Sequence, residues 1–195
     1  IFTVQRDGLP PLAVLGGNSA HGLTIKGGLL RDHHRAEIAS FFSGQPDNAM
    51  RVLVLHHHLR LLETLGAHDV ARGATETLDT AADAGVDLVL CGHIHKSTVE
   101  HVVVDTSHGH GQRVVIVSAG TATSNRSREV EVKRTNYYNW IAVEAERFTV
   151  EERRFDHDAG RYEAVRTTPF DMADDQRRRL GVRSDAVDAE NRAGR

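Results

Sequence analysis

Two short apolar segments that each end in histidines decide the fold of this chain. Residues 51–58 read Arg-Val-Leu-Val-Leu-His-His-His, and residues 86–95 read Val-Asp-Leu-Val-Leu-Cys-Gly-His-Ile-His. Compact apolar runs of this length are typical of buried strands. Between them, apolar residues recur at helical spacing over 71–84, and Gly85 is expected to end that helix. The sequence therefore predicts a strand–helix–strand unit with histidines after both strands.

This arrangement predicts a metal site. In open α/β sheets, ligands bind just beyond the carboxyl ends of the strands. If the two strands are parallel neighbours, the histidines of 56–58 open on the same edge as His93 and His95. Gly92 lets the backbone turn, and in an extended segment His93 and His95 would project from one face. They would then bind one ion together or one ion each. Imidazole suits Zn²⁺, Mn²⁺ and Fe ions alike, so the ligand type does not select the metal.

The rest of the chain is mostly strands. A helix is expected after Asp32, which can cap it. Further strands are expected over 1–7, 12–15, 99–104, 113–117, 137–143 and 148–155. Such a chain suggests two packed sheets with helices outside. We expect one domain over residues 1–165 and, because the apolar content then collapses, a polar tail over 166–195 that is disordered.

Composition limits the classes of function. The chain has 195 residues and a formal net charge of −3, which excludes a strongly basic nucleic-acid binder. It contains no apolar run long enough to cross a membrane and no signal peptide. Its single cysteine, Cys91, fits a reducing, cytoplasmic setting. The chain begins with Ile1 rather than Met, so we expect it to be cut from a longer one.

These motifs resemble the calcineurin-like metallophosphoesterases, which carry a histidine after one apolar strand and Gly-His-x-His after the next. Residues 53–58 resemble the first motif and residues 91–95 the second. Residues 15–20 and 117–124 also look like segments of the bacterial class III cyclic-nucleotide phosphodiesterases. The resemblance covers about residues 1–165, and it corresponds to the C-terminal portion of the family's domain.

The resemblance implies a four-layer α/β/β/α sandwich, here without its N-terminal part. It also implies hydrolysis of a small-molecule phosphodiester, such as a 3′,5′-cyclic nucleotide, by a hydroxide on two divalent ions (Mn, Fe or Zn). Carried over by motif, His93 binds one ion and His95 the other. His57 is the third expected ligand because it stands two positions before Leu59, where the family has a proline. His56 and His58 remain alternatives, and Arg126 is the candidate for gripping a phosphate oxygen.

The family's Asp-x-His, Gly-Asp and Gly-Asn-His-Asp/Glu motifs would precede residue 1. They supply the carboxylate that bridges the ions and the expected general acid, so no catalytic residue is assigned here. Three neutral imidazoles leave the repulsion between two divalent cations uncompensated. We therefore expect the isolated chain to be a poor enzyme. The alternative is a non-catalytic remnant, or one chain of a split phosphoesterase, with a metal-binding or structural role only.

Other candidates have simpler interpretations. His108-Gly109-His110 lies between two expected strands and is typical of a hairpin turn. His33 and His34 stand at a helix start and are expected to be exposed. Cys91 ends a buried strand and is expected to be a small core residue. Asn18 is a weak candidate for the family's asparagine ligand, since Ser19 follows it where the motif needs histidine.

Overall fold

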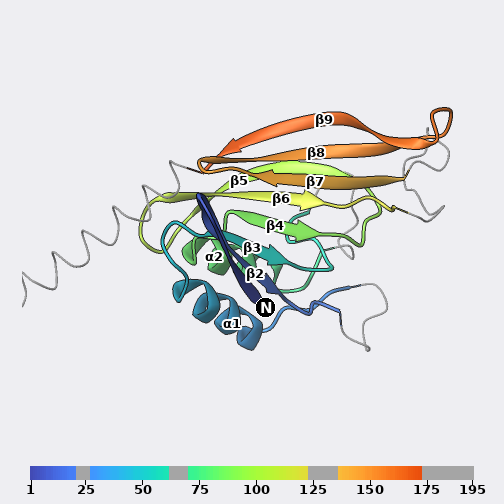
Figure 1. The fold of residues 1–195 in the computed structure, drawn as a ribbon. Coiled ribbons are helices and arrows are strands. Elements are labelled where there is room, and N and C mark those ends of the chain that lie inside the picture. Colours follow the sequence, from blue (N-terminus) through green and yellow to red (C-terminus); the bar gives the residue numbers. More distant parts are fainter. Residues whose placement is uncertain (21–26, 62–69, 123–135, 173–195) are drawn as a thin grey trace, which may run out of the picture.

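The computed structural model describes residues 1–20, 27–61, 70–122 and 136–172. Its elements are β1 (Phe2–Arg6), β2 (Leu9–Gly16), α1 (Asp32–Ser43), β3 (Met50–Val54), α2 (Ala74–Asp83), β4 (Leu88–Cys91), β5 (Thr98–Asp105), β6 (Gly111–Ser118), β7 (Tyr137–Val143), β8 (Arg147–Asp156) and β9 (Arg161–Asp171) (Figure 1). Neither of these helices has the length and apolar character that crossing a membrane requires.

The strands form a six-stranded mixed sheet and a three-stranded antiparallel sheet. The order in the larger sheet is β1-β2-β3-β4-β6-β5, and β7-β8-β9 form the smaller one. Strands β2, β3, β4 and β6 run parallel, and β1 and β5 are antiparallel edges. In the β3–β4 pair Val52 lies opposite Leu88 and Val54 opposite Leu90. The predicted parallel pairing of the two histidine-bearing strands is confirmed.

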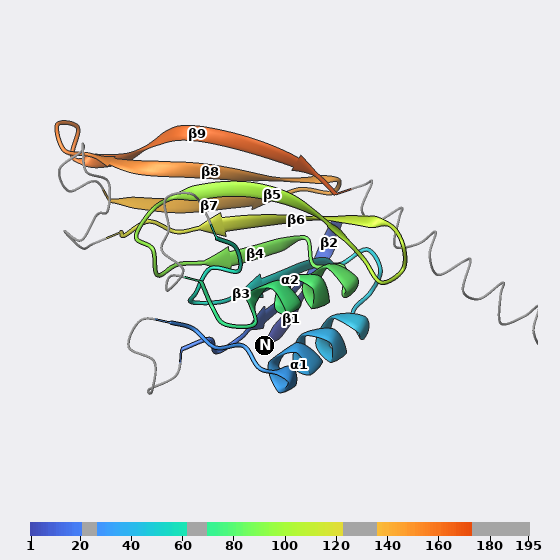
Figure 2. The same ribbon diagram turned by 180° about the vertical axis from the view of Figure 1, so that it is seen from behind.

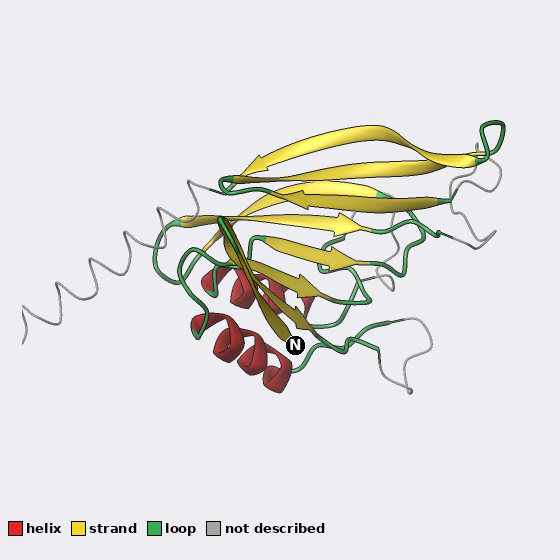
Figure 3. Cartoon of the chain, viewed as in Figure 1, coloured by secondary structure: helices red, strands yellow, loops and turns green. Residues whose placement is uncertain are grey.

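The described residues form three layers. Figure 3 shows both helices on the side of the six-stranded sheet that faces away from β7–β9, and Figure 2 shows them next to each other there. One apolar core lies between the helices and the sheet, with Phe42, Leu53 and Ile116 fully buried in it. A second core lies between the two sheets and includes Val117 and Phe148. The mixed α/β prediction is confirmed; a helical layer over the outer face of β7–β9 is not among the described residues.

Local sequence explains how α2 returns the chain to the sheet edge. Gly85 takes a left-handed φ of 68° directly after the helix, a conformation that costs glycine little. The Val86 amide donates to the Ala81 carbonyl at 2.9 Å, and the Gly85 amide donates to Ala82 at 2.9 Å. These two bonds are those of a Schellman cap. The predicted helix end at Gly85 is confirmed, and the cap turns the chain into β4.

Strand β9 was not expected from the sequence. It runs to Asp171, and Phe170 and Met172 are buried against the second core, beyond residue 165 where the sequence suggested that the domain ends. The Phe148 and Phe170 rings stack with centroids 5.1 Å apart. The remainder of the expected tail, residues 173–195, lies outside the described residues.

The turn between β5 and β6 contains His108-Gly109-His110, as predicted. Gly109 has a φ of 80°, and the Thr106 amide donates to the His110 carbonyl at 2.9 Å. The pair of histidines is therefore explained by hairpin geometry and is placed at the opposite end of β6 from Ser118.

Contact between the two sheets should contribute a large part of the stability. We expect Phe148→Ala to lower the free energy of unfolding by about 3 kcal/mol, because the side chain is fully buried and a cavity would remain. Val165→Ala, on an exposed side chain of the same sheet, should change it by less than about 0.5 kcal/mol. Urea denaturation measures both. Equal effects of the two substitutions would contradict the packing of β7–β9 on the larger sheet.

The Cys91 thiol should be inert in the folded chain. Burial raises its pKa to about 12, and the thiolate is the reactive species. We expect very slow labelling by Ellman's reagent near neutral pH and rapid labelling of one thiol per chain in concentrated guanidinium. Rapid labelling without denaturant would show that the end of β4 is open to solvent.

Candidate metal centre

Parallel pairing brings the two histidine-bearing loops to the same edge of the sheet. The Leu55 amide donates to the Leu90 carbonyl at 2.9 Å, continuing the β3–β4 ladder by one residue. The Gly92 amide then donates to the His56 carbonyl at 3.1 Å. This second bond joins the backbones of the two loops at the point where their histidines begin.

His56, His57 and His93 form a group that could hold a metal ion. Each offers one ring nitrogen, and these nitrogens all lie within 4.8 Å of one another. The Nδ1 of His93 is 3.2 Å from the Nε2 of His56. Two nitrogens on one tetrahedral Zn²⁺ stand about 3.3 Å apart, given Zn–N bonds of about 2.0–2.1 Å. The separation between His56 and His93 therefore matches a shared ion, and His57 offers a third imidazole nitrogen within 4.8 Å of theirs.

Ser19 and Gly28 hold the ring of His57 in this group. The side-chain oxygen of Ser19, which is fully buried, accepts the His57 amide at 3.1 Å and lies 3.0 Å from its Nδ1. When Nδ1–H donates to Ser19, the Nε2 lone pair of His57 is directed to a metal, which is the usual support for a histidine ligand. Gly28 leaves room for the ring, since a Cβ there would lie 2.6 Å from the His57 Nδ1.

Neither supporting residue was identified as functional from the sequence. In the sequence, Ser19 stands where an asparagine–histidine motif would need histidine, and it carries no sign of a contact with His57. The Gly27-Gly28 pair is a signal of close approach that could have been used, but it does not say which side chain approaches.

His58 is not part of the group. The side chain is fully buried, and its Nδ1 lies 2.9 Å from the Arg60 carbonyl oxygen and 3.2 Å from the Arg60 amide nitrogen. Burial lowers the pKa of His58 below its ordinary value, so the ring is neutral near pH 7. Of the three histidines left open by the sequence, the structure brings His56, which is exposed, and His57, which is 4% exposed, into the group.

The Gly92–His95 segment is a tight turn rather than the extended segment that the sequence suggested. His93 and His95 have positive φ angles of 67° and 55°. The Ile94 amide donates to the Gly92 carbonyl at 2.8 Å, which closes a three-residue turn around His93. The side chains of His93 and His95 therefore do not project from one face as they would in an extended strand. His95 is not part of the group. The assignment of His57, His93 and His95 as the ligand set stays a prediction.

The group contains no carboxylate. Asp32-His33-His34 has the letters of the family's Asp-x-His motif, but it opens α1, where Asp32 pairs with Arg35. Asn18 accepts the Ala20 amide at 3.0 Å through its side-chain oxygen and lies outside the group. Arg126 lies outside the described residues, so its expected contact with phosphate stays a prediction.

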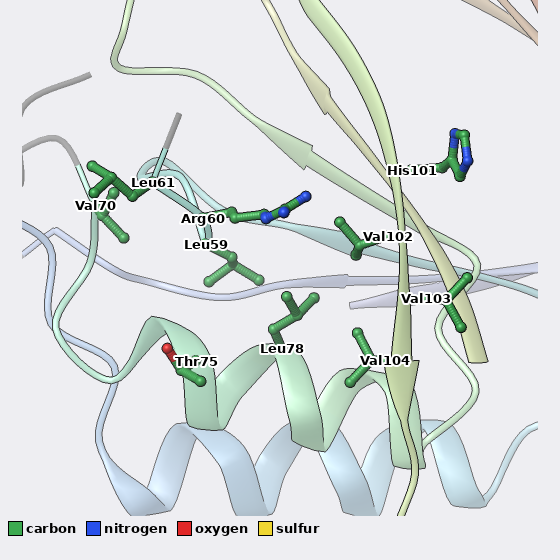
Figure 4. A pocket seen from close by; sticks show the side chains of 10 residues that line it. All are labelled: Leu59, Arg60, Leu61, Val70, Thr75, Leu78, His101, Val102, Val103 and Val104. Atoms are coloured by element: carbon green, nitrogen blue, oxygen red, sulfur yellow. The ribbon is translucent and has the colours of Figure 1, made fainter. Parts of the chain in front are cut away.

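A cavity of about 620 Å³ lies on the helix side of β5, and its lining does not include the three histidines of the candidate metal group. Figure 4 shows Leu78 of α2 and Val102 and Val104 of β5 around it, with Arg60 at its upper side. None of His56, His57 and His93 lines it. The cavity therefore provides no substrate site beside the metal group.

Comparisons with known proteins give only weak likeness. No family model and no curated protein matches the sequence. Among solved structures, the chain resembles a single mutant of Vps29 from Entamoeba histolytica, with 14% identity, a TM-score of 0.35, and 80% of this chain and 98% of that one covered. Wild-type Vps29 of this organism complexed with zinc is 12% identical, with a TM-score of 0.34, and 81% of this chain and 98% of that one are covered. Chaetomium thermophilum Vps29 is 10% identical, with a TM-score of 0.36, and 82% of this chain and 97% of that one are covered. TM-scores this low support no conclusion about fold or function.

Substitution of Gly28 tests the histidine group directly. We expect Gly28→Ala to weaken binding of Zn²⁺ by at least about tenfold, because the added methyl displaces the His57 ring from its contact with Ser19. Gly16→Ala is the matched control, since a Cβ there meets no atom within 4 Å. Isothermal titration calorimetry measures both. Equal zinc affinity in the two variants would contradict a ligand role for His57.

Proposed function

We propose that this chain provides the histidine ligands of a metal-dependent phosphoesterase. In this proposal His56, His57 and His93 bind one divalent ion, and the complete site hydrolyses a phosphodiester such as a 3′,5′-cyclic nucleotide. The four-layer sandwich of the calcineurin-like family, with a second helical layer outside β7–β9, belongs to the same proposal. His95 would contact a second ion and Arg126 a phosphate oxygen.

The observation that carries the proposal is the convergence of imidazoles from the ends of two parallel strands. Histidines on a protein surface are common, but here one of the three is 4% exposed, and its Nδ1 lies 3.0 Å from a fully buried hydroxyl. A buried polar side chain needs a partner for its polar atoms, and a metal ion would be such a partner for the Nε2 of His57. The 3.2 Å separation between the His56 and His93 nitrogens adds the spacing that one ion requires.

A divalent ion bound here would polarise a phosphoryl oxygen and lower the pKa of a bound water. The contribution of this chain's own residues is to fix the ligand geometry. Ser19 orients His57, the Gly92–His56 backbone bond ties the two loops, and the neutral, buried His58 anchors the first loop through Arg60. Neutral imidazoles do not bridge two divalent ions, so a dinuclear site would need acidic ligands besides these residues.

A second candidate function is metal binding without catalysis. The absence of a carboxylate from the described histidine group favours it. A neutral ligand set does not compensate the repulsion between two divalent cations a few ångströms apart. In this alternative the chain binds one ion for a structural purpose, or acts only when another polypeptide contributes acidic ligands.

Metal titration tests the binding half of the proposal. We expect one Zn²⁺ or Mn²⁺ per chain, with a rise in melting temperature that grows with the metal concentration as linkage requires. His57→Ala and His93→Ala should each weaken metal binding and reduce this rise. His108→Ala, in the β5–β6 turn, is the matched control and should bind metal normally.

The catalytic half is measured with bis(p-nitrophenyl) phosphate at saturating Mn²⁺. We expect little or no turnover by the isolated chain, because its histidine group lacks an acidic ligand. Substantial metal-dependent turnover that disappears in His93→Ala would contradict this expectation and favour a complete site within the chain. Failure of every metal to raise the melting temperature would overturn the proposed function itself.

A further inference from the structure

A partly buried polar network lies directly after the Gly92–His95 turn. The Ser97 hydroxyl is 2.9 Å from Oε1 of Glu152 and 3.2 Å from Oδ1 of Asn139. The Asn139 amide nitrogen donates to the Ser118 carbonyl at 3.0 Å, which fixes the orientation of that side chain. Two strands of the smaller sheet, β7 and β8, therefore hold a residue that follows the candidate ligands by only a few positions.

The turn needs such support because its backbone is strained. Left-handed φ angles at non-glycine residues cost about 1–3 kcal/mol each and persist only when the surroundings fix them. Both His93 and His95 are left-handed. At the start of the turn, the Gly92 amide is bonded to the His56 carbonyl, and Ile94 is fully buried. Ser97 supplies the corresponding tie at the end of the turn.

The position of Glu152 is difficult to explain by stability alone. On β8, Phe148 and Val150 point into the core between the sheets, and Glu152 continues the same face with only 7% exposure. Burying a carboxylate costs free energy that an apolar residue would not incur. Its charged neighbour, the Arg166 guanidinium, is 3.7 Å away and largely exposed. Toward the turn, Glu152 offers a hydrogen-bond acceptor, and the Ser97 hydroxyl donates to it at 2.9 Å.

We propose that Glu152 and Asn139 are positioning residues that act through Ser97. They hold Ser97 against the smaller sheet, and this fixes the left-handed turn that presents His93 to His56 and His57. The inference rests on the proposed metal-binding function. It gives the smaller sheet a role in the site, although no residue of β7–β9 belongs to the histidine group.

Ser97→Ala is the principal test. We expect the affinity for Zn²⁺ alone, measured by calorimetry, to fall about 10- to 100-fold, as is typical when a residue that supports a metal ligand is removed. Ser43→Ala is the matched control, because it also removes a hydroxyl that donates to a carbonyl, but at the end of α1. It should bind zinc as the unmodified chain does.

Glu152→Gln distinguishes positioning from charge. The amide oxygen still accepts the Ser97 hydroxyl proton, so zinc affinity should stay within about threefold of the unmodified chain. The inference would be overturned if Ser97→Ala bound zinc as tightly as the unmodified chain while zinc binding by the chain still required His93. A loss in Ser97→Ala that is matched by Ser43→Ala would also overturn it.

A readout without metal separates this inference from the proposed function. If the unmodified chain binds no zinc, the proposed function fails, and amide hydrogen exchange then decides whether the positioning contact exists. We expect exchange at the Gly92 and Ile94 amides to be about tenfold faster in Ser97→Ala than in Ser43→Ala, because both amides are hydrogen-bonded in the turn. Equal exchange rates in the two variants would overturn the inference whatever the metal result.

Discussion

The parallel pairing of β3 with β4 is the constraint on which the candidate site depends. Because Val54 lies opposite Leu90, both strands end at the same level, and the ladder continues into the loops through the Leu55 and Gly92 amides. A shift of the pairing by one residue would reverse which side chains face the helices, and it would separate His56 from His93. The Schellman cap at Gly85 and the two apolar cores serve to keep this register.

Charge sets the limit on what the group can do. Three imidazoles are neutral ligands, so this group is suited to binding a single divalent ion. A second ion requires an acidic bridging ligand. The buried carboxylate nearest to the turn in the described network, Glu152, is directed to Ser97 rather than to the histidines. The arrangement therefore favours a site that binds metal first and acquires catalysis only with further acidic groups.

Sequence patterns were sufficient to predict those helices, strands and turns that local periodicity or turn chemistry specifies. The apolar runs of β3, β4 and β6, the helix α2 with Gly85, and the His108–His110 turn were predicted correctly because periodicity or turn chemistry specifies them locally. Strand β9 was missed because its middle residues, such as Arg166 and Thr167, are polar and exposed, and its core contacts come late, at Phe170 and at Met172 just after the strand. Its pairing with β8 depends on tertiary structure and cannot be predicted from local composition.

The same distinction applies to the site. The two histidine loops could be found from sequence, since each follows a recognisable strand. The choice of His57 depends on its contact with Ser19, 38 residues earlier in the chain. The left-handed turn at His93 and His95 is followed by Ser97, whose partner Glu152 lies on β8. The sequence alone does not distinguish three neighbouring histidines. Their burial and their hydrogen-bond partners in the folded chain distinguish them.

X-ray absorption at the zinc edge tests the central claim most directly, because it reports the ligands of the bound ion in the unmodified chain. We predict a shell of three imidazole nitrogens at about 2.0–2.1 Å, with the imidazole contribution reduced by one in His57→Ala and in His56→Ala. A shell made only of oxygens, or an imidazole contribution unaffected by either substitution, would contradict the assignment of a metal to this edge of the sheet.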